Sequence, residues 1–116
     1  PIVHGAVVRP GTHVDLVGAF TPQMVEADDA LIARAALYVD TRRGALAEAG
    51  EIVGAIARGV ITAASVRAEL AELVHDPSCG RRGEHEITVF KSVGTGLADL
   101  AAARLVWSYH ARGNAR

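Results

Sequence analysis

This 116-residue chain contains a single cysteine and few aromatic residues, and its charges of the two signs nearly balance. Its one cysteine, Cys79, cannot form an internal disulfide, and no charged-then-apolar leader opens the sequence, so we expect a reducing, cytoplasmic setting. The 12 basic and 13 acidic residues nearly cancel, so there is no electrostatic reason to expect binding of nucleic acid or an anionic membrane. No apolar run approaches the roughly 20 residues that cross a bilayer.

The usual patterns of metal and nucleophile chemistry are missing as well. The five histidines are scattered, without an i, i+4 pair or a cysteine partner at metal spacing, so no metal site is expected. Cys79 has no histidine that the sequence places beside it, which leaves a nucleophilic role unsupported. We interpret Arg81 and Arg82, in the same glycine-containing stretch, as solvated side chains rather than as a phosphate contact.

What is present is an alternation of short strands and helices. Half of the residues are hydrophobic, alanine is abundant, and β-branched runs alternate with helix formers, which predicts an α/β fold with a parallel sheet. Asp28 and Asp29 precede a helical apolar pattern that includes Leu31 and Ile32. Strands are predicted at residues 14–17, 37–39 and 87–90.

The middle of the chain is predicted to be mainly helical. Residues 42–59 mix good helix formers with glycines, so the helix there is expected to be broken into pieces. Thr62 is a suitable N-cap for a helix that continues to Val74 and ends before Pro77. Residues 76–84 then form an exposed loop.

The most informative junction follows the third predicted strand, where Gly94 and Gly96 lead into a helix predicted to end at His110. Such a junction directs backbone N–H groups beyond the carboxyl end of a strand, the usual ligand position in open α/β sheets. Only three strands are visible, however, where a complete dinucleotide-binding sheet has about six, and the G-x-G-x-x-G motif is missing. A small α/β domain and a piece of a longer enzyme are the two interpretations, and the second accounts for the missing strands.

Three segments in order, GTHVDLVGAF (11–20), YVDTRRGALAEAG (38–50) and EITVFKSVGTGLADLAAA (86–103), resemble the ornithine cyclodeaminase and mu-crystallin family of NAD(P)-dependent enzymes. The resemblance implies that residues 1–95 are the later half of a Rossmann domain. Residues 96–116 would be a carboxyl-terminal helix that returns to the substrate and dimerisation domain. A homodimer, an NAD(P) cofactor and a small imino acid or amino acid substrate are implied with it.

The same resemblance assigns site residues position by position. Val17, Gly18, Ala19 and Ser92 match residues that contact the cofactor, and Phe20 and Val93 match substrate-side positions. Lys91 is either a partner of the cofactor or of a carboxylate, or a solvated residue. Catalytic residues are not identified, because the family's substrate-carboxylate arginine and lysine precede Pro1. The residue that selects NADH or NADPH also precedes it.

One departure from the family pattern concerns the chemistry. Phe20 stands where the ornithine-cyclising members have an aspartate, and Met24 replaces a nearby lysine. Phenylalanine can neither carry a proton nor neutralise an ammonium group. The resemblance therefore favours the branch that reduces cyclic imines such as Δ1-pyrroline-2-carboxylate. The alternatives are a lyase that converts ornithine to proline and ammonia, and a truncated, non-catalytic binding or dimerisation remnant.

Overall fold

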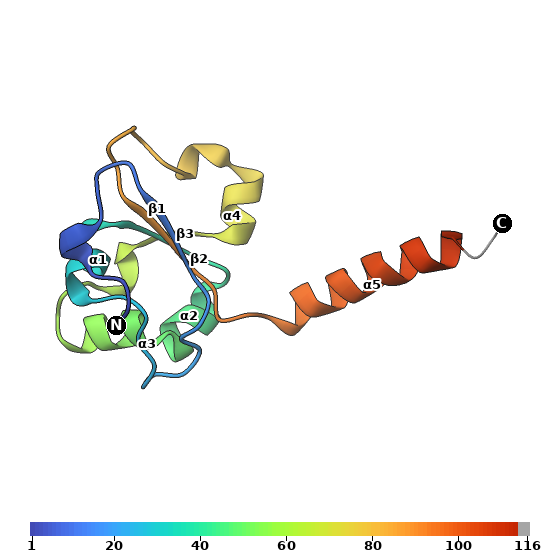
Figure 1. Cartoon of the computed structure of the whole chain (residues 1–116), viewed down its shortest axis with the longest axis horizontal. Coiled ribbons are helices and arrows are strands. Elements are labelled where there is room, and N and C mark those ends of the chain that lie inside the picture. Colours follow the sequence, from blue (N-terminus) through green and yellow to red (C-terminus); the bar gives the residue numbers. More distant parts are fainter. Residues whose placement is uncertain (114–116) are drawn as a thin grey trace.

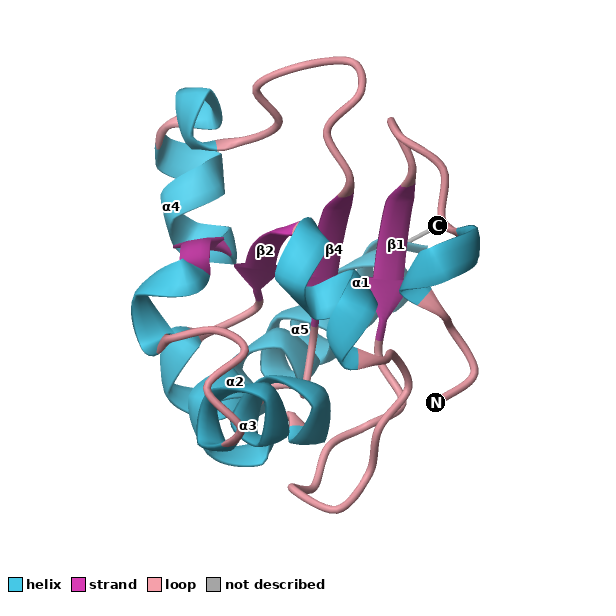
Figure 2. Cartoon of the chain, turned by 90° about the vertical axis from the view of Figure 1, so that its left-hand side faces the viewer, coloured by secondary structure: helices cyan, strands magenta, loops and turns pink. Residues whose placement is uncertain are grey.

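Four short parallel strands form one sheet in the computed structural model, which describes residues 1–113. The strand order is β1-β4-β2-β3, so the last strand lies between the first and the second, as Figure 2 shows for β1, β4 and β2. The strands are β1 (His13–Leu16), β2 (Ala36–Val39), β3 (Val66–Glu69) and β4 (Thr88–Lys91). The helices are α1 (Asp29–Arg34), α2 (Arg42–Glu48), α3 (Gly50–Ala57), α4 (Leu70–His75) and α5 (Gly96–Gly113). The predicted mixed α/β fold with a parallel sheet is confirmed.

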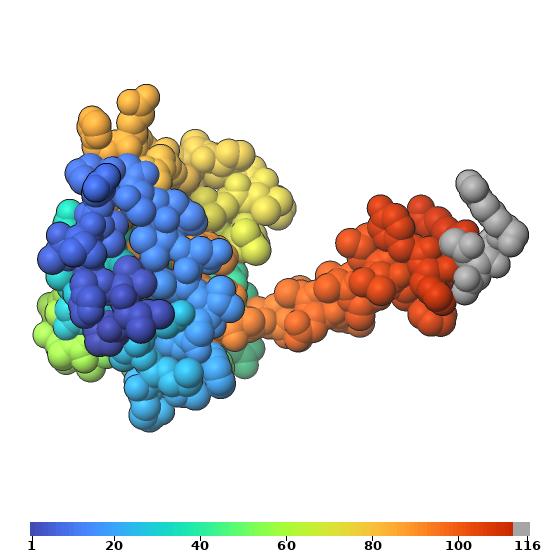
Figure 3. Space-filling model, viewed as in Figure 1, coloured from blue at the N-terminus to red at the C-terminus, as the bar shows by residue number. Residues whose placement is uncertain are grey.

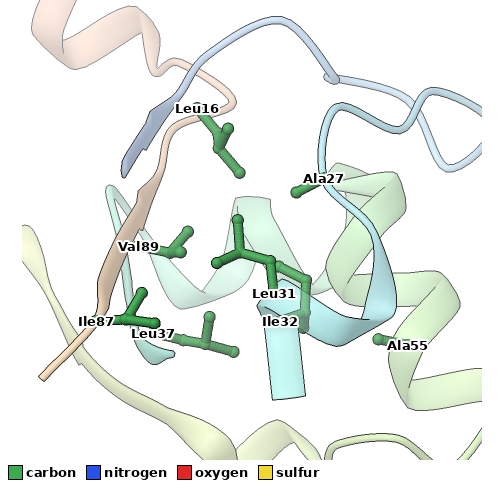
Figure 4. Close-up of a cluster of buried hydrophobic side chains, with 8 residues drawn as sticks. All are labelled: Leu16, Ala27, Leu31, Ile32, Leu37, Ala55, Ile87 and Val89. Carbon is green, nitrogen blue, oxygen red and sulfur yellow. The ribbon is translucent and has the colours of Figure 1, made fainter. Parts of the chain in front are cut away.

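One face of the sheet is buried under α1, α2 and α3. In register, Leu16, Lys91 and Val39 lie side by side as the last residues of β1, β4 and β2. Figure 4 shows how side chains from the strands face those of α1, and the buried cluster there contains Leu16, Ala27, Leu31, Ile32, Leu37, Ala55, Ile87 and Val89. The opposite face carries Tyr38 and Ala68, against which Leu73 of α4 packs.

All three predicted strands are present, with bounds that differ from the expected ones by about one residue. The fourth strand corrects the sequence prediction, because residues 66–69 form β3 and not the middle of a helix that starts at Thr62. Thr62 instead caps the 3₁₀ turn Ala63–Ser65, and the helix α4 begins only at Leu70. Val66 and Ala68 are buried while Arg67 and Glu69 are half-buried, so pairing with β2 overrides the local helix preference.

The helical interruptions in the middle of the chain are confirmed. Residues 42–57 form α2 and α3, which share Ala49 as the C-cap of one and the N-cap of the other. The short α1 is capped by Asp28, whose side chain accepts a hydrogen bond from Leu31 N and a second one from Gly5 N. This second bond fastens the first residues of the chain beside α1.

The last helix, α5, stands away from the rest of the molecule (Figure 1). It extends past the predicted end at His110, while residues 114–116 of the expected 96–116 segment lie outside the described residues. Most of its side chains are exposed, among them Leu97, Val106 and Trp107. Within residues 1–113, no helix is long and apolar enough to cross a membrane.

Candidate functional site

The carboxyl ends of β1 and β4 bring together the two segments that carry the predicted site residues. The two strands pair in parallel, and Ser92 N donates a 2.9 Å hydrogen bond to Leu16 O. Gly18 follows the end of β1 and Ser92 follows the end of β4, so both lie at the same edge of the sheet. Two residues that the family resemblance assigns to the cofactor thus lie just past the carboxyl ends of neighbouring strands.

Asp40, which directly follows β2, organises the loop after β4. Its Oδ2 accepts hydrogen bonds from Ser92 Oγ at 2.9 Å, Val93 N at 3.0 Å and Gly94 N at 2.8 Å. Gly94 has a φ of +86°, in the left-handed region where a side chain would strain the backbone. Because the Ser92 hydroxyl proton is directed at Asp40, the serine oxygen offers a ligand an acceptor rather than a donor.

The loop after β1 exposes backbone at the same edge. Val17 and Gly18 are exposed, and Phe20 is 56% exposed, whereas Ala19 is buried. Ala19 N donates to Glu26 Oε2 at 3.0 Å, so this amide is already satisfied within the chain. A Cβ atom added to Gly18 would lie 2.8 Å from Glu26 Oε1, so glycine here lets the carboxylate approach the backbone while the opposite side of the peptide stays exposed.

Lys91, the last residue of β4, is buried and not solvated. Its side chain is 1% exposed, and Nζ lies 2.8 Å from Glu26 Oε2 and 3.1 Å from Glu51 Oε1. The interpretation of Lys91 as a solvated residue is therefore wrong, and the carboxylates beside it are those of Glu26 and Glu51. Within residues 1–113, neither carboxyl oxygen of Glu51 has a hydrogen bond of good geometry, so Lys91 provides its charge compensation by proximity.

Glu26 and Glu51 are the residues of this edge that the sequence prediction missed. Partial burial alone would raise the pKa of Glu26, but hydrogen bonds from Lys91 and from the backbone N–H groups of Ala19 and Gly18 outweigh it and lower the pKa. Glu26 is therefore ionised at neutral pH. The burial of their partner Lys91 could have been predicted from the sequence. Side chains alternate between the two faces of a strand, so Lys91 shares the buried face of β4 with Val89.

Val93 occupies a different environment from Phe20. It is half-buried and packs against the cluster of Val39, Ala45, Ala49, Ile52 and Val66 beneath α2 and α3. A Cβ atom added to Gly44 would lie 2.9 Å from Val93 Cγ2, which shows how closely α2 approaches this side chain. Phe20, in contrast, projects from the loop after β1 with more than half of its surface exposed.

The remaining polar candidates lie elsewhere. His13 Nδ1 is 2.8 Å from Thr88 Oγ1, and Arg81 donates to the same oxygen and to Glu86 O. Arg81 and Arg82 are both exposed, in agreement with their interpretation as solvated side chains. Desolvation and the Asp76 carboxylate raise the pKa of the Cys79 thiol, which lowers its reactivity. No group of three potential metal ligands occurs in the part of the chain that the structure describes.

Comparison with known proteins agrees with this arrangement. The model of the ornithine cyclodeaminase/mu-crystallin family matches residues 1–114. The chain belongs to this family. It is 54% identical over 106 residues to a Δ1-pyrroline-2-carboxylate reductase of Paracoccus denitrificans, with 91% of the chain and 34% of that relative covered. The chain thus spans about a third of the length of the curated relatives that it matches.

Two solved structures that are similar in sequence have the same fold. The Δ1-pyrroline-2-carboxylate reductase of Thermococcus litoralis, in complex with NADH and L-proline, superposes with a TM-score of 0.93 at 36% identity, over 98% of this chain and 35% of that one. An archaeal alanine dehydrogenase dimer with bound NAD gives a TM-score of 0.88 at 33% identity, over 98% of this chain and 35% of that one. Both of these similar proteins bind a nicotinamide cofactor.

Proposed function

We propose that the complete protein containing this chain is an NAD(P)H-dependent reductase of cyclic imino acids, with Δ1-pyrroline-2-carboxylate as its substrate. The observation that carries the proposal is the position of Phe20. It is exposed on the loop that adjoins Gly18, where a lyase acting on ornithine would need an ionisable group. The identity of 54% to the Paracoccus reductase supports the same choice.

The residues at the carboxyl edge fit a nicotinamide cofactor. Exposed backbone at Val17 and Gly18 gives a flat ring close access, and Ala19 contributes no bulk at the surface. The Ser92 hydroxyl donates to Asp40 and accepts a long hydrogen bond of 3.3 Å from Gly94 N, which leaves one lone pair for a carboxamide N–H. The bound cofactor supplies a hydride to the carbon of the substrate C=N bond. Phe20 and Val93 are assigned to the substrate side, where Phe20 provides an apolar wall for the uncharged part of the ring.

We further propose that the chain spans two domains and that the complete protein is a homodimer. Residues 1–95 would be the later half of the Rossmann domain, and residues 96–116 would pack on the substrate and dimerisation domain. The exposed apolar side chains of α5 support this division, because such a surface is rarely left uncovered in a soluble enzyme. The archaeal alanine dehydrogenase, which is a dimer, supports the proposed assembly.

The experiment is a comparison of two reactions on the purified complete protein. We expect oxidation of NADH or NADPH with Δ1-pyrroline-2-carboxylate, followed by nicotinamide absorbance, and no ammonia release from ornithine. A Phe20→Asp variant should lose at least about tenfold in reductase turnover, or about 1.4 kcal/mol in the barrier, because an unpaired carboxylate repels an anionic substrate. Ornithine conversion by the wild type at a rate equal to its best reductase rate would establish the lyase instead.

A further inference from the structure

We propose that Lys91 and Glu26 are positioning residues, which hold the loop of Gly18 and Ala19 in the conformation that receives the nicotinamide ring. The proposal rests on the proposed function, since it concerns the same cofactor site. It adds to that site two charged residues that do not themselves contact the ligand.

Lys91 is an unusual residue at the end of a buried strand. It lies in register with Leu16 and Val39, which are 2% and 0% exposed, and its own ammonium group is shielded from water between α3 and the loop after β1. A buried ammonium group without a partner is strongly destabilising, so its position requires the carboxylates beside it. Lys91 thus fixes where Glu26 and Glu51 must lie.

Glu26 transmits that constraint to the loop after β1. One oxygen, Oε2, accepts from both Lys91 Nζ at 2.8 Å and Ala19 N at 3.0 Å, so a single atom joins the end of β4 to the loop. The other oxygen, Oε1, lies close to Gly18, because a Cβ atom added to this glycine would be only 2.8 Å from it. The carboxylate therefore sets the height and the orientation of the Gly18–Ala19 peptide.

The far part of the same loop is held by α3. A Cβ atom added to Gly50 would lie 2.0 Å from Met24 O, so the backbone there packs directly on the first turn of α3. Glu51, the next residue, is the second carboxylate beside Lys91. The loop is consequently fastened at Ala19 and again at Met24, and the exposed Phe20 lies between the two points.

This arrangement predicts a selective effect on the nicotinamide end of the cofactor. Ser92 is held separately by Asp40, so loss of the Glu26 contact would move only one of the two segments at the site. The adenosine half binds where the carboxyl ends of the earlier strands lie in dinucleotide-binding folds, remote from this contact. A small displacement of a reacting group is enough to lose about 10²-fold in rate.

The test compares two ligands of the complete protein in a Glu26→Gln variant. NADH, or NADPH if that is the preferred cofactor, carries the nicotinamide ring, and ADP-ribose, or its 2′-phosphate, lacks it. We expect the dissociation constant of the reduced cofactor to rise at least tenfold, that of the ADP-ribose ligand to stay within twofold, and turnover to fall at least tenfold. A merely structural role would weaken both ligands equally or neither of them.

Glu86→Gln is the matched control. Glu86, like Glu26, accepts from one cationic side chain and from the backbone, here from Arg67 and from Arg82 N–H. Its side chain is 22% exposed against 20% for Glu26. It lies on the loop before β4, away from the carboxyl edge, so its substitution should change neither ligand affinity. A control variant that shows the same selective loss would overturn the proposal.

A Glu26→Asp variant keeps the test decisive if Glu26→Gln does not fold. It retains the charge that Lys91 needs but is one methylene too short to hold both Lys91 and Ala19, so the same selective loss is expected. Wild-type affinity for both ligands in a folded Glu26→Asp variant would refute the positioning role while leaving the proposed function intact. Absence of cofactor binding by the wild type would instead refute the proposed function itself.

Discussion

The α/β body and the helix α5 differ in how they expose apolar side chains. In the body, Leu31 and Val89 are 0% exposed within a cluster that joins three strands to α1. In α5, Leu97 is 77% and Trp107 is 72% exposed, and Figure 3 shows the helix projecting from the body. Different interactions therefore stabilise the two regions.

Tertiary packing stabilises the body, whereas intrinsic helix propensity stabilises α5. Alanine, leucine and arginine, which are strong helix formers, make up much of residues 96–106, and an 18-residue helix is long enough to form on its own in part. Its first turns line a surface groove together with α4, with Leu97 and Ala98 on one side and Leu70 and Val74 on the other. The exposed apolar side chains of α5 therefore support the proposed packing of this helix on a second domain.

The largest expected effect contrasts one substitution in each region of the isolated chain. Leu31→Ala should lower the free energy of unfolding by about 2–5 kcal/mol, because it leaves a cavity in the main cluster. Trp107→Ala should change it by less than about 0.5 kcal/mol, since the side chain is exposed. Urea unfolding followed by circular dichroism measures both values.

The same pair of variants in the complete protein tests whether a second domain covers α5. If α5 packs on a second domain, Trp107→Ala should there cost about 3–5 kcal/mol, similar to other large-to-small substitutions in a core. An equal, small effect of Trp107→Ala in the isolated chain and in the complete protein would show that α5 is not covered, and the proposed domain division would be wrong.

The second prediction concerns association of the isolated chain. Uncovered apolar surface costs roughly 25 cal/mol per Å², so we expect the chain to self-associate or to bind a hydrophobic dye. Replacing Leu105 and Trp107 by lysine should reduce association, because both are exposed on α5. Sedimentation velocity measures the change, and a compact wild-type monomer that binds no dye would contradict the expectation.

The fold was largely predictable because its strands are marked by local composition. Residues 87–90 and 37–39 carry β-branched and aromatic side chains between clear breaks, and the structure places β4 and β2 within one residue of them. β3 was not predictable in the same way, since Val66 to Glu69 alternates for only four residues inside a helix-forming context. Its pairing with β2 is a tertiary effect that no local window contains.

The candidate site was predictable only in outline. The position of Gly18 and Ser92 follows from strand ends that the sequence displays, and the structure confirms it. The ion pair of Lys91 and Glu26 joins residues that are 65 positions apart, so no local pattern reports it. Burial of Lys91 was foreseeable from its place on the Val89 face, but its partner was not.

The smallest expected effect is the response of the body to acid. Hydrogen bonds from the Arg67 guanidinium and from Arg82 N–H lower the pKa of Glu86 to about 2 from its ordinary value of 4.5. A carboxyl group with a lower pKa in the folded chain stabilises the fold at pH above its unfolded pKa. This contribution is therefore complete at neutral pH and is lost as the pH falls from about 4.5 to about 2.

Glu86→Gln tests this contribution and extends the comparison of the two regions. The variant should lose about 1 kcal/mol or less at neutral pH, as expected for a partly exposed ion pair, and its stability should fall less steeply than that of the wild type below pH 4.5. Amide exchange at Tyr38 and Arg67 should report the loss, because Arg67 joins Tyr38 to Glu86. Trp107 fluorescence should stay unchanged by the substitution, since α5 lies apart from this contact. An identical pH dependence in wild type and variant would mean that other carboxylates of the body, such as Glu26 or Asp28, carry the acid response.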